Sequence, residues 1–224
     1  MRDSYNMQKT DVSIPCGTLT LEGVLEAPEK SQAILPGAVI CHPHPLYGGN
    51  MHNSVVRAVR NAFIDKGFAC LRFNFRGTGG SWGEYGNGID ELDDVLAAID
   101  FLVSRSEIDE TRLVIAGYSF GCWVGLKAAV RDSRPGRLIG ISPPVNEYDF
   151  SFLNHETRPK LFITGDRDFV CSKEGFQKLL DQIPEPKKGV IIPGADHFHM
   201  NSEDTITEET KSFLTEYPFE ERKN

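Results

Sequence analysis

The sequence lacks the features of a membrane-spanning or exported chain. None of its apolar runs approaches the roughly 20 residues that a membrane helix needs. Residues 1–8 are polar, and no apolar run follows a basic end there. We therefore expect a soluble, cytoplasmic protein with no membrane partner.

Positive charge is also scarce. The chain has 24 Lys and Arg against 32 Asp and Glu, a formal net charge of -8, and no long basic run. Because binding to phosphate backbones or anionic lipid depends on an excess of Lys and Arg, this composition predicts no nucleic-acid partner.

Cysteines are few, odd in number and never spaced as C-x-x-C. A disulfide framework and a thiolate zinc site are both disfavoured by this pattern, and reduced thiols of a cytoplasmic protein fit it best. The five positions are Cys16, Cys41, Cys70, Cys122 and Cys171.

The 224 residues, 40% of them hydrophobic, suffice for one large core, and no internal repeat is visible. We expect a single domain over residues 1–224, with its core at about 11–217. Two strand-like runs separated by two residues predict an antiparallel hairpin. Six continuous apolar runs typical of parallel strands buried on both faces follow. The expected strands are 11–16, 19–26, 37–41, 69–75, 113–116, 138–141, 161–164 and 190–192.

Apolar residues at helical spacing lie between these runs, at 55–63, 89–102, 176–183 and 206–217. Alternating strands and helices predict an α/β fold: about eight strands, mostly parallel, with helices on both faces of the sheet. In such folds ligands bind beyond the carboxyl ends of the strands, so functional residues are expected just after strands.

One candidate nucleophile lies at such a position. Residues 117–121 read Gly-Tyr-Ser-Phe-Gly, between the expected strand 113–116 and a helix-like segment. The G-x-S-x-G pattern alone is weak evidence, but a strand that turns directly into a helix holds the serine out at the edge of the sheet. This context predicts Ser119 as nucleophile and the Phe120 N–H as a donor to a developing oxyanion.

Serine needs a base, and the base needs a carboxylate to orient it. Among six histidines, His197 follows the last expected strand. After strand 161–164 the chain offers Asp166 and Asp168. We favour Asp168 because a carboxylate three residues after the glycine at the strand end, here Gly165, is familiar in this class of fold. We expect Asp166 to cap a turn or to pair with Arg167.

The order Ser119, Asp168, His197 resembles that of the α/β-hydrolase superfamily. The segment 42–49, His-Pro-His-Pro-Leu-Tyr-Gly-Gly, is similar to small bacterial hydrolases related to dienelactone hydrolases and carboxylesterases. The resemblance spans roughly residues 11–217 and implies that the loop beginning at His42 supplies a second oxyanion N–H. Prolines 43 and 45 cannot donate, so we favour Leu46 over Tyr47 or His44.

A lid in this superfamily is commonly inserted where this chain has only a short stretch, 145–159. No large cap domain is therefore expected, and an open site suits short-chain or accessible esters, cleaved through an acyl-enzyme without a cofactor. Thioester, lactone and small-amide hydrolysis stay open. The expected partner is a small-molecule ester, and homo-oligomer formation is left open. Candidates for lining the pocket, or for ordinary packing, are Tyr47, Trp82, Phe120, Tyr148 and Phe169.

Three other functions fit parts of the sequence. The pairs His42-x-His44 and His197-x-His199 suit a metal site but leave the serine turn unexplained, so no metal is expected. Residues 74–81 are glycine-rich but lack the Lys-Ser/Thr ending of a phosphate-binding loop, so nucleotide binding is disfavoured. A non-catalytic binding protein with a hydrolase fold is the alternative of another class, since fold alone does not establish function.

Overall fold

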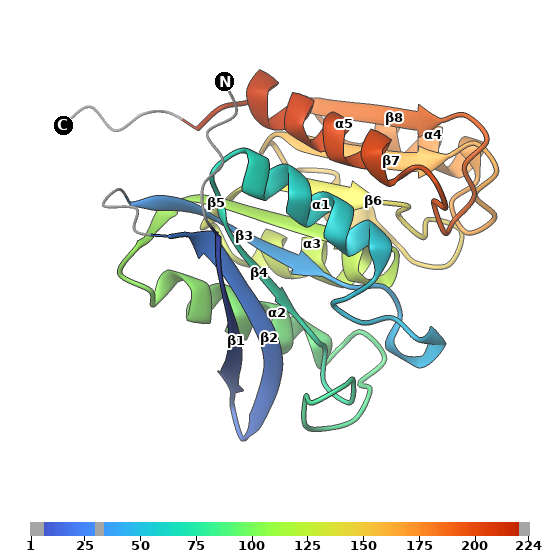
Figure 1. The fold of residues 1–224 in the computed structure, drawn as a ribbon. Helices are drawn as coiled ribbons and strands as arrows, with labels where there is room; N and C mark the ends of the chain where they lie inside the picture. Colours follow the sequence, from blue (N-terminus) through green and yellow to red (C-terminus); the bar gives the residue numbers. More distant parts are fainter. Residues whose placement is uncertain (1–6, 30–33, 220–224) are drawn as a thin grey trace.

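The computed structural model describes residues 7–29 and 34–219 (Figure 1). These residues contain one eight-stranded sheet in the order β1-β2-β4-β3-β5-β6-β7-β8. The eight strands expected from the sequence are confirmed, with shifted ends. Their bounds are β1 Met7–Cys16, β2 Leu19–Pro28, β3 Leu35–Cys41, β4 Ala69–Phe73, β5 Ile108–Tyr118, β6 Pro135–Ile141, β7 Lys160–Gly165 and β8 Lys187–Ile192.

The hairpin β1–β2 is antiparallel, and β2 pairs antiparallel with β4. The other pairings, from β4 through β3 and β5 to β8, are parallel. The run expected at 69–75 ends early, at Phe73, because the Glu22 N–H of β2 donates to Ser81 Oγ at 2.9 Å and not to the Asn74 carbonyl, and because the Phe75 N–H leaves the ladder. Asn74 N–H donates to the Glu22 carbonyl at 2.8 Å, and Phe75 N–H donates to the His42 ring at 3.0 Å.

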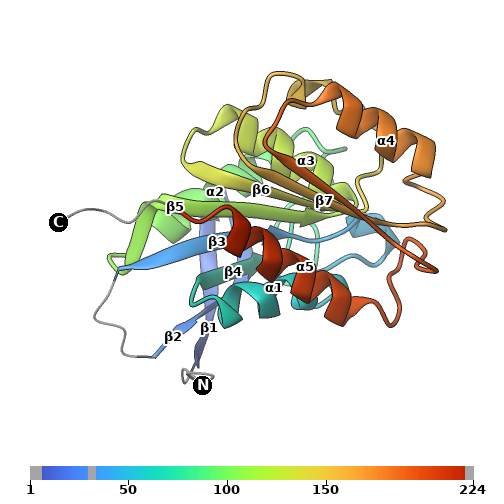
Figure 2. The ribbon, with the colours of Figure 1, turned by 90° about the horizontal axis from the view of Figure 1, so that it is seen from above.

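Helices cover both faces of the sheet (Figure 2). In the described part of the chain α1 and α5 pack on one face, where Val55 and Phe213 share a core cluster, and α2, α3 and α4 pack on the other. The bounds are α1 Ser54–Asp65, α2 Glu91–Val103, α3 Phe120–Arg131, α4 Lys173–Gln182 and α5 Glu203–Glu216. This three-layer arrangement confirms the predicted fold class.

The segment between β6 and β7 decides what reaches the carboxyl edge of the sheet. Between β6 and β7, residues 142–159 carry only the short 3₁₀ helix η2, Ser151–Leu153, so no lid domain stands over the edge.

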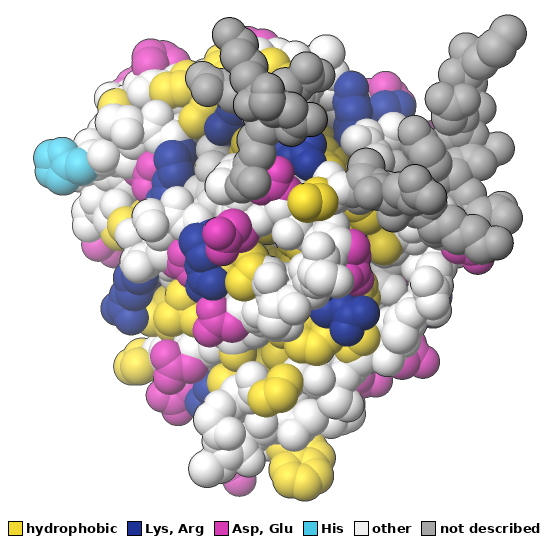
Figure 3. Space-filling model, turned by 90° about the vertical axis from the view of Figure 1, so that its left-hand side faces the viewer, with side chains coloured by type: hydrophobic (Ala, Val, Ile, Leu, Met, Phe, Trp, Pro, Cys, Tyr) yellow, Lys and Arg dark blue, Asp and Glu magenta, His cyan; other side chains and the backbone are white. Residues whose placement is uncertain are grey.

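Within the described ranges no helix combines the length and the apolar character that crossing a bilayer requires. On the face in Figure 3 acidic and basic side chains are interspersed, without a large area of one sign.

Candidate active site

Ser119 stands between β5 and α3 in a conformation that few residues adopt. Its backbone has φ 54° and ψ -121°, and its N–H donates to the Ile141 carbonyl at 2.9 Å. A Cβ on Gly121 would collide with the carbonyls of Cys41 and His42, and one on Gly117 would collide with Gly121 itself. Glycines on both sides therefore let the chain turn sharply and hold the serine at the sheet edge.

His197 and Asp168 complete a hydrogen-bonded series with this serine. His197 Nε2 lies 3.0 Å from Ser119 Oγ, and its Nδ1 lies 3.0 Å from both carboxylate oxygens of Asp168. All three residues are buried, with 8% or less of each exposed. The loops that follow β5, β7 and β8 bring together residues that are far apart in the sequence, as the sequence analysis expected.

The carboxylate of Asp168 is held by several donors. The amides of Val170 and Cys171 each donate to Oδ1 at 2.9 Å. Burial by itself raises the pKa of Asp168, but the hydrogen bonds from His197, Ser142 and Cys171 outweigh it and leave the pKa below its ordinary value. The group is thus an anion at neutral pH, suited to stabilise an imidazolium.

Asp166, the alternative acid, is directed elsewhere. Its Oδ1 accepts the Gly194 N–H at 2.7 Å, and its Oδ2 lies 3.7 Å from Lys173 Nζ. It therefore stabilises the turn after β8, much as the sequence analysis expected, although the charge it pairs with is Lys173 and not Arg167.

Two residues that the sequence analysis did not single out support the series. The Tyr118 hydroxyl donates to the His197 carbonyl at 2.7 Å and so fixes the loop that carries the imidazole. Ser142 bonds both to Asp168 and, at 2.7 Å, to His199 Nε2. Their positions, one before the nucleophile and one after β6, are the only signal the sequence holds for them.

The second oxyanion donor is not Leu46. The 3₁₀ turn η1, Pro45–Tyr47, directs the Leu46 N–H onto His44 Nδ1 at 3.2 Å, and the Tyr47 N–H donates to the His44 carbonyl at 3.1 Å. Of the backbone N–H groups of His44, Leu46 and Tyr47, that of His44 alone makes no hydrogen bond within residues 7–29 and 34–219. The Phe120 amide, first in α3, is equally uncommitted in that part of the chain.

A cleft of about 440 Å³ opens above Ser119. Tyr47, Phe120, Tyr148 and Phe169 line it, as expected. Trp82 does not line it. Its side chain is exposed, with a relative exposure of 66% for the residue, and its backbone N–H donates to the carbonyl of Thr20 in β2 of the β1–β2 hairpin. Glu147 and Phe198 also line the cleft and were not among the candidates from the sequence; His44, a candidate oxyanion donor, lines it too.

The histidines considered as metal ligands have separate contacts. His42 Nδ1 donates to the Pro43 carbonyl at 2.6 Å while Nε2 accepts the Phe75 N–H, and burial lowers the pKa of His42 to about 4. His44 Nε2 lies 3.0 Å from the Tyr85 hydroxyl. The described residues contain no group of three or more side chains suited to hold a metal ion.

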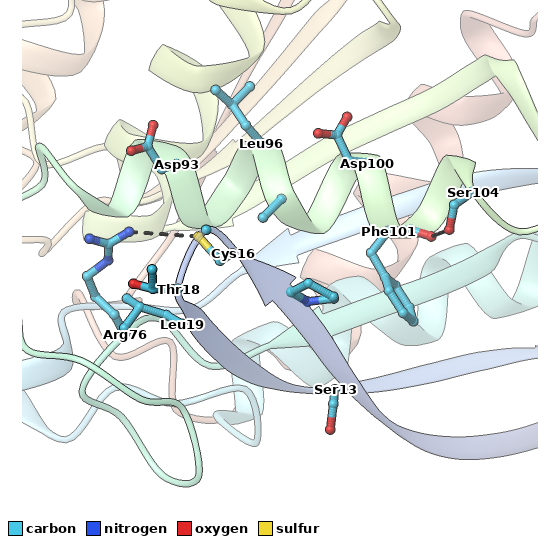
Figure 4. A pocket seen from close by; sticks show the side chains of 13 residues that line it. Ser13, Cys16, Thr18, Leu19, Arg76, Asp93, Leu96, Asp100, Phe101 and Ser104 are labelled. Atoms are coloured by element: carbon cyan, nitrogen blue, oxygen red, sulfur yellow. Dashed lines mark hydrogen bonds between the residues drawn. The ribbon is translucent and has the colours of Figure 1, made fainter.

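A larger cavity, of about 760 Å³, lies between the β1–β2 hairpin and α2 (Figure 4). Arg76, directed there toward Cys16, is neutralised by Asp94 at 2.7 Å. Burial raises the pKa of the Cys16 thiol to about 11, so the thiol stays protonated. Since the Ser119 series lies in the other cleft, that cleft is the candidate active site despite its smaller volume.

A serine, an imidazole and a carboxylate in series at this edge of such a sheet define an α/β serine hydrolase. Comparison with known proteins agrees. The chain is 37% identical over 190 residues to an uncharacterized protein of Rickettsia prowazekii, covering 81% of this chain and 78% of that one. Residues 54–135 match the prolyl oligopeptidase family.

Two solved structures are similar over nearly the whole chain. An α/β serine hydrolase homologue from Coxiella burnetii is 33% identical, with a TM-score of 0.84, over 94% of this chain and all of that one. A lidless α/β serine hydrolase from Xanthomonas campestris is 29% identical, also with a TM-score of 0.84, over 96% of this chain and 97% of that one. The chain belongs to the α/β-hydrolase superfamily.

Proposed function

We propose that this hydrolase cleaves carboxylic esters through an acyl-enzyme formed on Ser119. The observation that carries the proposal is the contact of 3.0 Å between Ser119 Oγ and His197 Nε2, with Asp168 behind the imidazole. This geometry gives the hydroxyl a base within hydrogen-bonding distance, which a serine needs in order to attack a carbonyl at neutral pH.

In the proposed reaction Ser119 Oγ bonds to the ester carbonyl carbon as its proton passes to His197 Nε2. The resulting oxyanion is stabilised by the amides of Phe120 and His44, next to the positive N-terminal end of α3. The intermediate then collapses: the ester C–O bond breaks as His197 gives its proton to the departing alcohol. A water molecule loses a proton to His197 and attacks the acyl carbon. His197 returns that proton to Ser119 Oγ as the acyl–serine bond breaks, which releases the carboxylic acid and free Ser119.

The open cleft supports small or accessible acyl groups. Among the residues that the structure describes, no lid domain covers Ser119, and the aromatic side chains beside it are well exposed: Tyr47 is 86% and Phe169 is 65% exposed. A shallow, partly apolar cleft binds a short acyl chain better than a long lipid chain, which would need a deeper pocket. A short-chain carboxylesterase is therefore our first choice, ahead of thioester, lactone or small-amide hydrolysis.

A fluorophosphonate probe tests the nucleophile. We expect it to label the wild-type protein and not Ser119→Ala, and we expect Ser119→Ala to lose nearly all turnover while it keeps its melting temperature. Folded wild-type protein that stays unlabelled would favour the non-catalytic binding protein.

A substrate screen tests the ester class. It compares p-nitrophenyl esters of graded chain length with a thioester, a lactone and a prolyl anilide. We expect the highest kcat/KM for short esters. A higher kcat/KM for the anilide would redirect the proposal to amide bonds, the chemistry of the peptidase family that residues 54–135 match.

A further inference from the structure

The lining of the candidate active site is unbalanced in charge. Of the described residues, no lysine or arginine lines the cleft, while one carboxylate, Glu147, does. Burial lowers the pKa of His44, although the neighbouring Glu147 opposes this, so the His44 ring is largely neutral at pH 7. A substrate with a negative group thus meets no lysine or arginine in the cleft.

Glu147 is free to face a ligand. It lies on the loop after β6, where its side chain is exposed and makes no hydrogen bond or ion pair within the described ranges. Its neighbour Tyr148 is held by stacking on Trp123, with ring centroids 4.2 Å apart. Lys127 lies on the Trp123 ring, outside the lining of the cleft. The carboxylate therefore stands beside a fixed aromatic ring without a basic partner.

The same cleft is rich in aromatic faces. Tyr47 packs on His44, with ring centroids 4.5 Å apart, and Phe169 lies next to His197 and Phe198. Aromatic faces attract cations, above all quaternary ammonium groups, whose methyl groups also gain from apolar contact. Rings with one unpaired carboxylate among them form a combination that suits a cation.

The charge of the whole molecule acts in the same direction. A net charge of -8 raises the local concentration of cations and repels anions. A site that selected anionic esters would require basic residues in its lining, which this cleft does not offer.

We propose that Glu147 is a specificity-determining residue, and that the cleft prefers esters with a cationic, alkylammonium-like group over neutral esters of the same shape and over anionic esters. The proposal rests on the proposed esterase function and adds the charge class of the substrate.

Two isosteric substrate pairs separate charge from shape. In the first, the cation is in the alcohol: acetylcholine is compared with dimethylbutyl acetate, in which carbon replaces the quaternary nitrogen. In the second, the cation is in the acyl group: the p-nitrophenyl ester of γ-trimethylammoniobutanoic acid is compared with its all-carbon isostere. The measurement is the ratio of kcat/KM, cationic over neutral, within each pair.

In at least one pair we expect a wild-type ratio of about fivefold, the size typical of exposed cation–π and ion-pair contacts. Glu147→Gln should lower this ratio to about twofold, the part that cation–π contact alone supplies, and Glu147→Lys should lower it further. Added salt should lower the wild-type ratio, because it screens an exposed charge. Glu110→Gln, at the opposite end of β5, is the matched control and should leave the ratio unchanged.

A ratio that Glu147→Gln leaves unchanged in both pairs would overturn this inference. That outcome differs from failure of the proposed function, in which the neutral esters are not hydrolysed either, or are hydrolysed equally by Ser119→Ala.

Discussion

Asp168 sets the orientation of the imidazole, because both of its oxygens lie 3.0 Å from His197 Nδ1. Asp168→Asn should lower kcat by about 10³–10⁴-fold, since an amide cannot stabilise the imidazolium and favours the wrong tautomer. Steady-state kinetics on a p-nitrophenyl ester measures this effect.

Asp166→Asn is the matched control for that prediction. The Asp166 carboxylate accepts the Gly194 N–H and pairs with Lys173, and it does not contact the imidazole. The kcat of Asp166→Asn should therefore stay within a fewfold of the wild-type value. If Asp166→Asn were the more damaging change, Asp168 would not be the acid of the series.

At the scale of an element, the loop after β3 decides the second oxyanion donor. His44 has φ -54°, which proline adopts without strain, so His44→Pro removes the amide hydrogen while the backbone keeps its conformation. His44→Ala removes the same side chain and keeps the amide. We expect kcat of His44→Pro to be about 10²–10³-fold below that of His44→Ala.

Equal melting temperatures of the two variants would confirm that the loop is intact. Equal kcat values would instead show that the His44 amide takes no part. Leu46→Pro supplies a second comparison: because the Leu46 amide donates, among the described residues, to the His44 ring alone, its loss should lower kcat far less than the loss of the His44 amide.

At the scale of the whole molecule, His42 couples stability to pH. The ring is fully buried between the loops after β3 and β4, and burial lowers its pKa from 6.5 to about 4. Between the two pKa values the unfolded chain binds a proton at His42 and the folded chain does not. The free energy of unfolding is therefore highest above pH 6.5, the pKa in the unfolded chain, and decreases as the pH falls toward the pKa in the folded protein. Protonation of His42 in the unfolded chain should lower the free energy of unfolding by about 2–3 kcal/mol between about pH 7.5 and pH 4.5.

Urea unfolding of wild type and His42→Gln at both pH values measures this coupling. The variant should lose less stability on acidification, by about that amount, whatever its absolute stability. His155→Gln, which changes an exposed histidine, is the control and should show the wild-type difference. Identical losses in wild type and His42→Gln would contradict the role of His42.

The order of residues along the chain was enough to predict the strands, the turn at Ser119, and the positions of Asp168 and His197. Continuous apolar runs predicted the strands, because strands buried on both faces hold few polar residues. Glycines 117 and 121 marked the turn at Ser119, because only a residue without Cβ fits there. Strand ends predicted Asp168 and His197, because parallel strands bring their carboxyl ends to one edge.

Only the tertiary structure decided the rest. Leu46 was the wrong donor because a 3₁₀ turn directed its amide to His44, and Trp82 was the wrong lining residue because its loop packs beside the β1–β2 hairpin. Tyr118 and Ser142 carried no signal in the sequence beyond their places before the nucleophile and after β6. Their roles depend on distances between loops from different strands, and the direction of an amide or a side chain in a loop follows from packing and not from the order of residues.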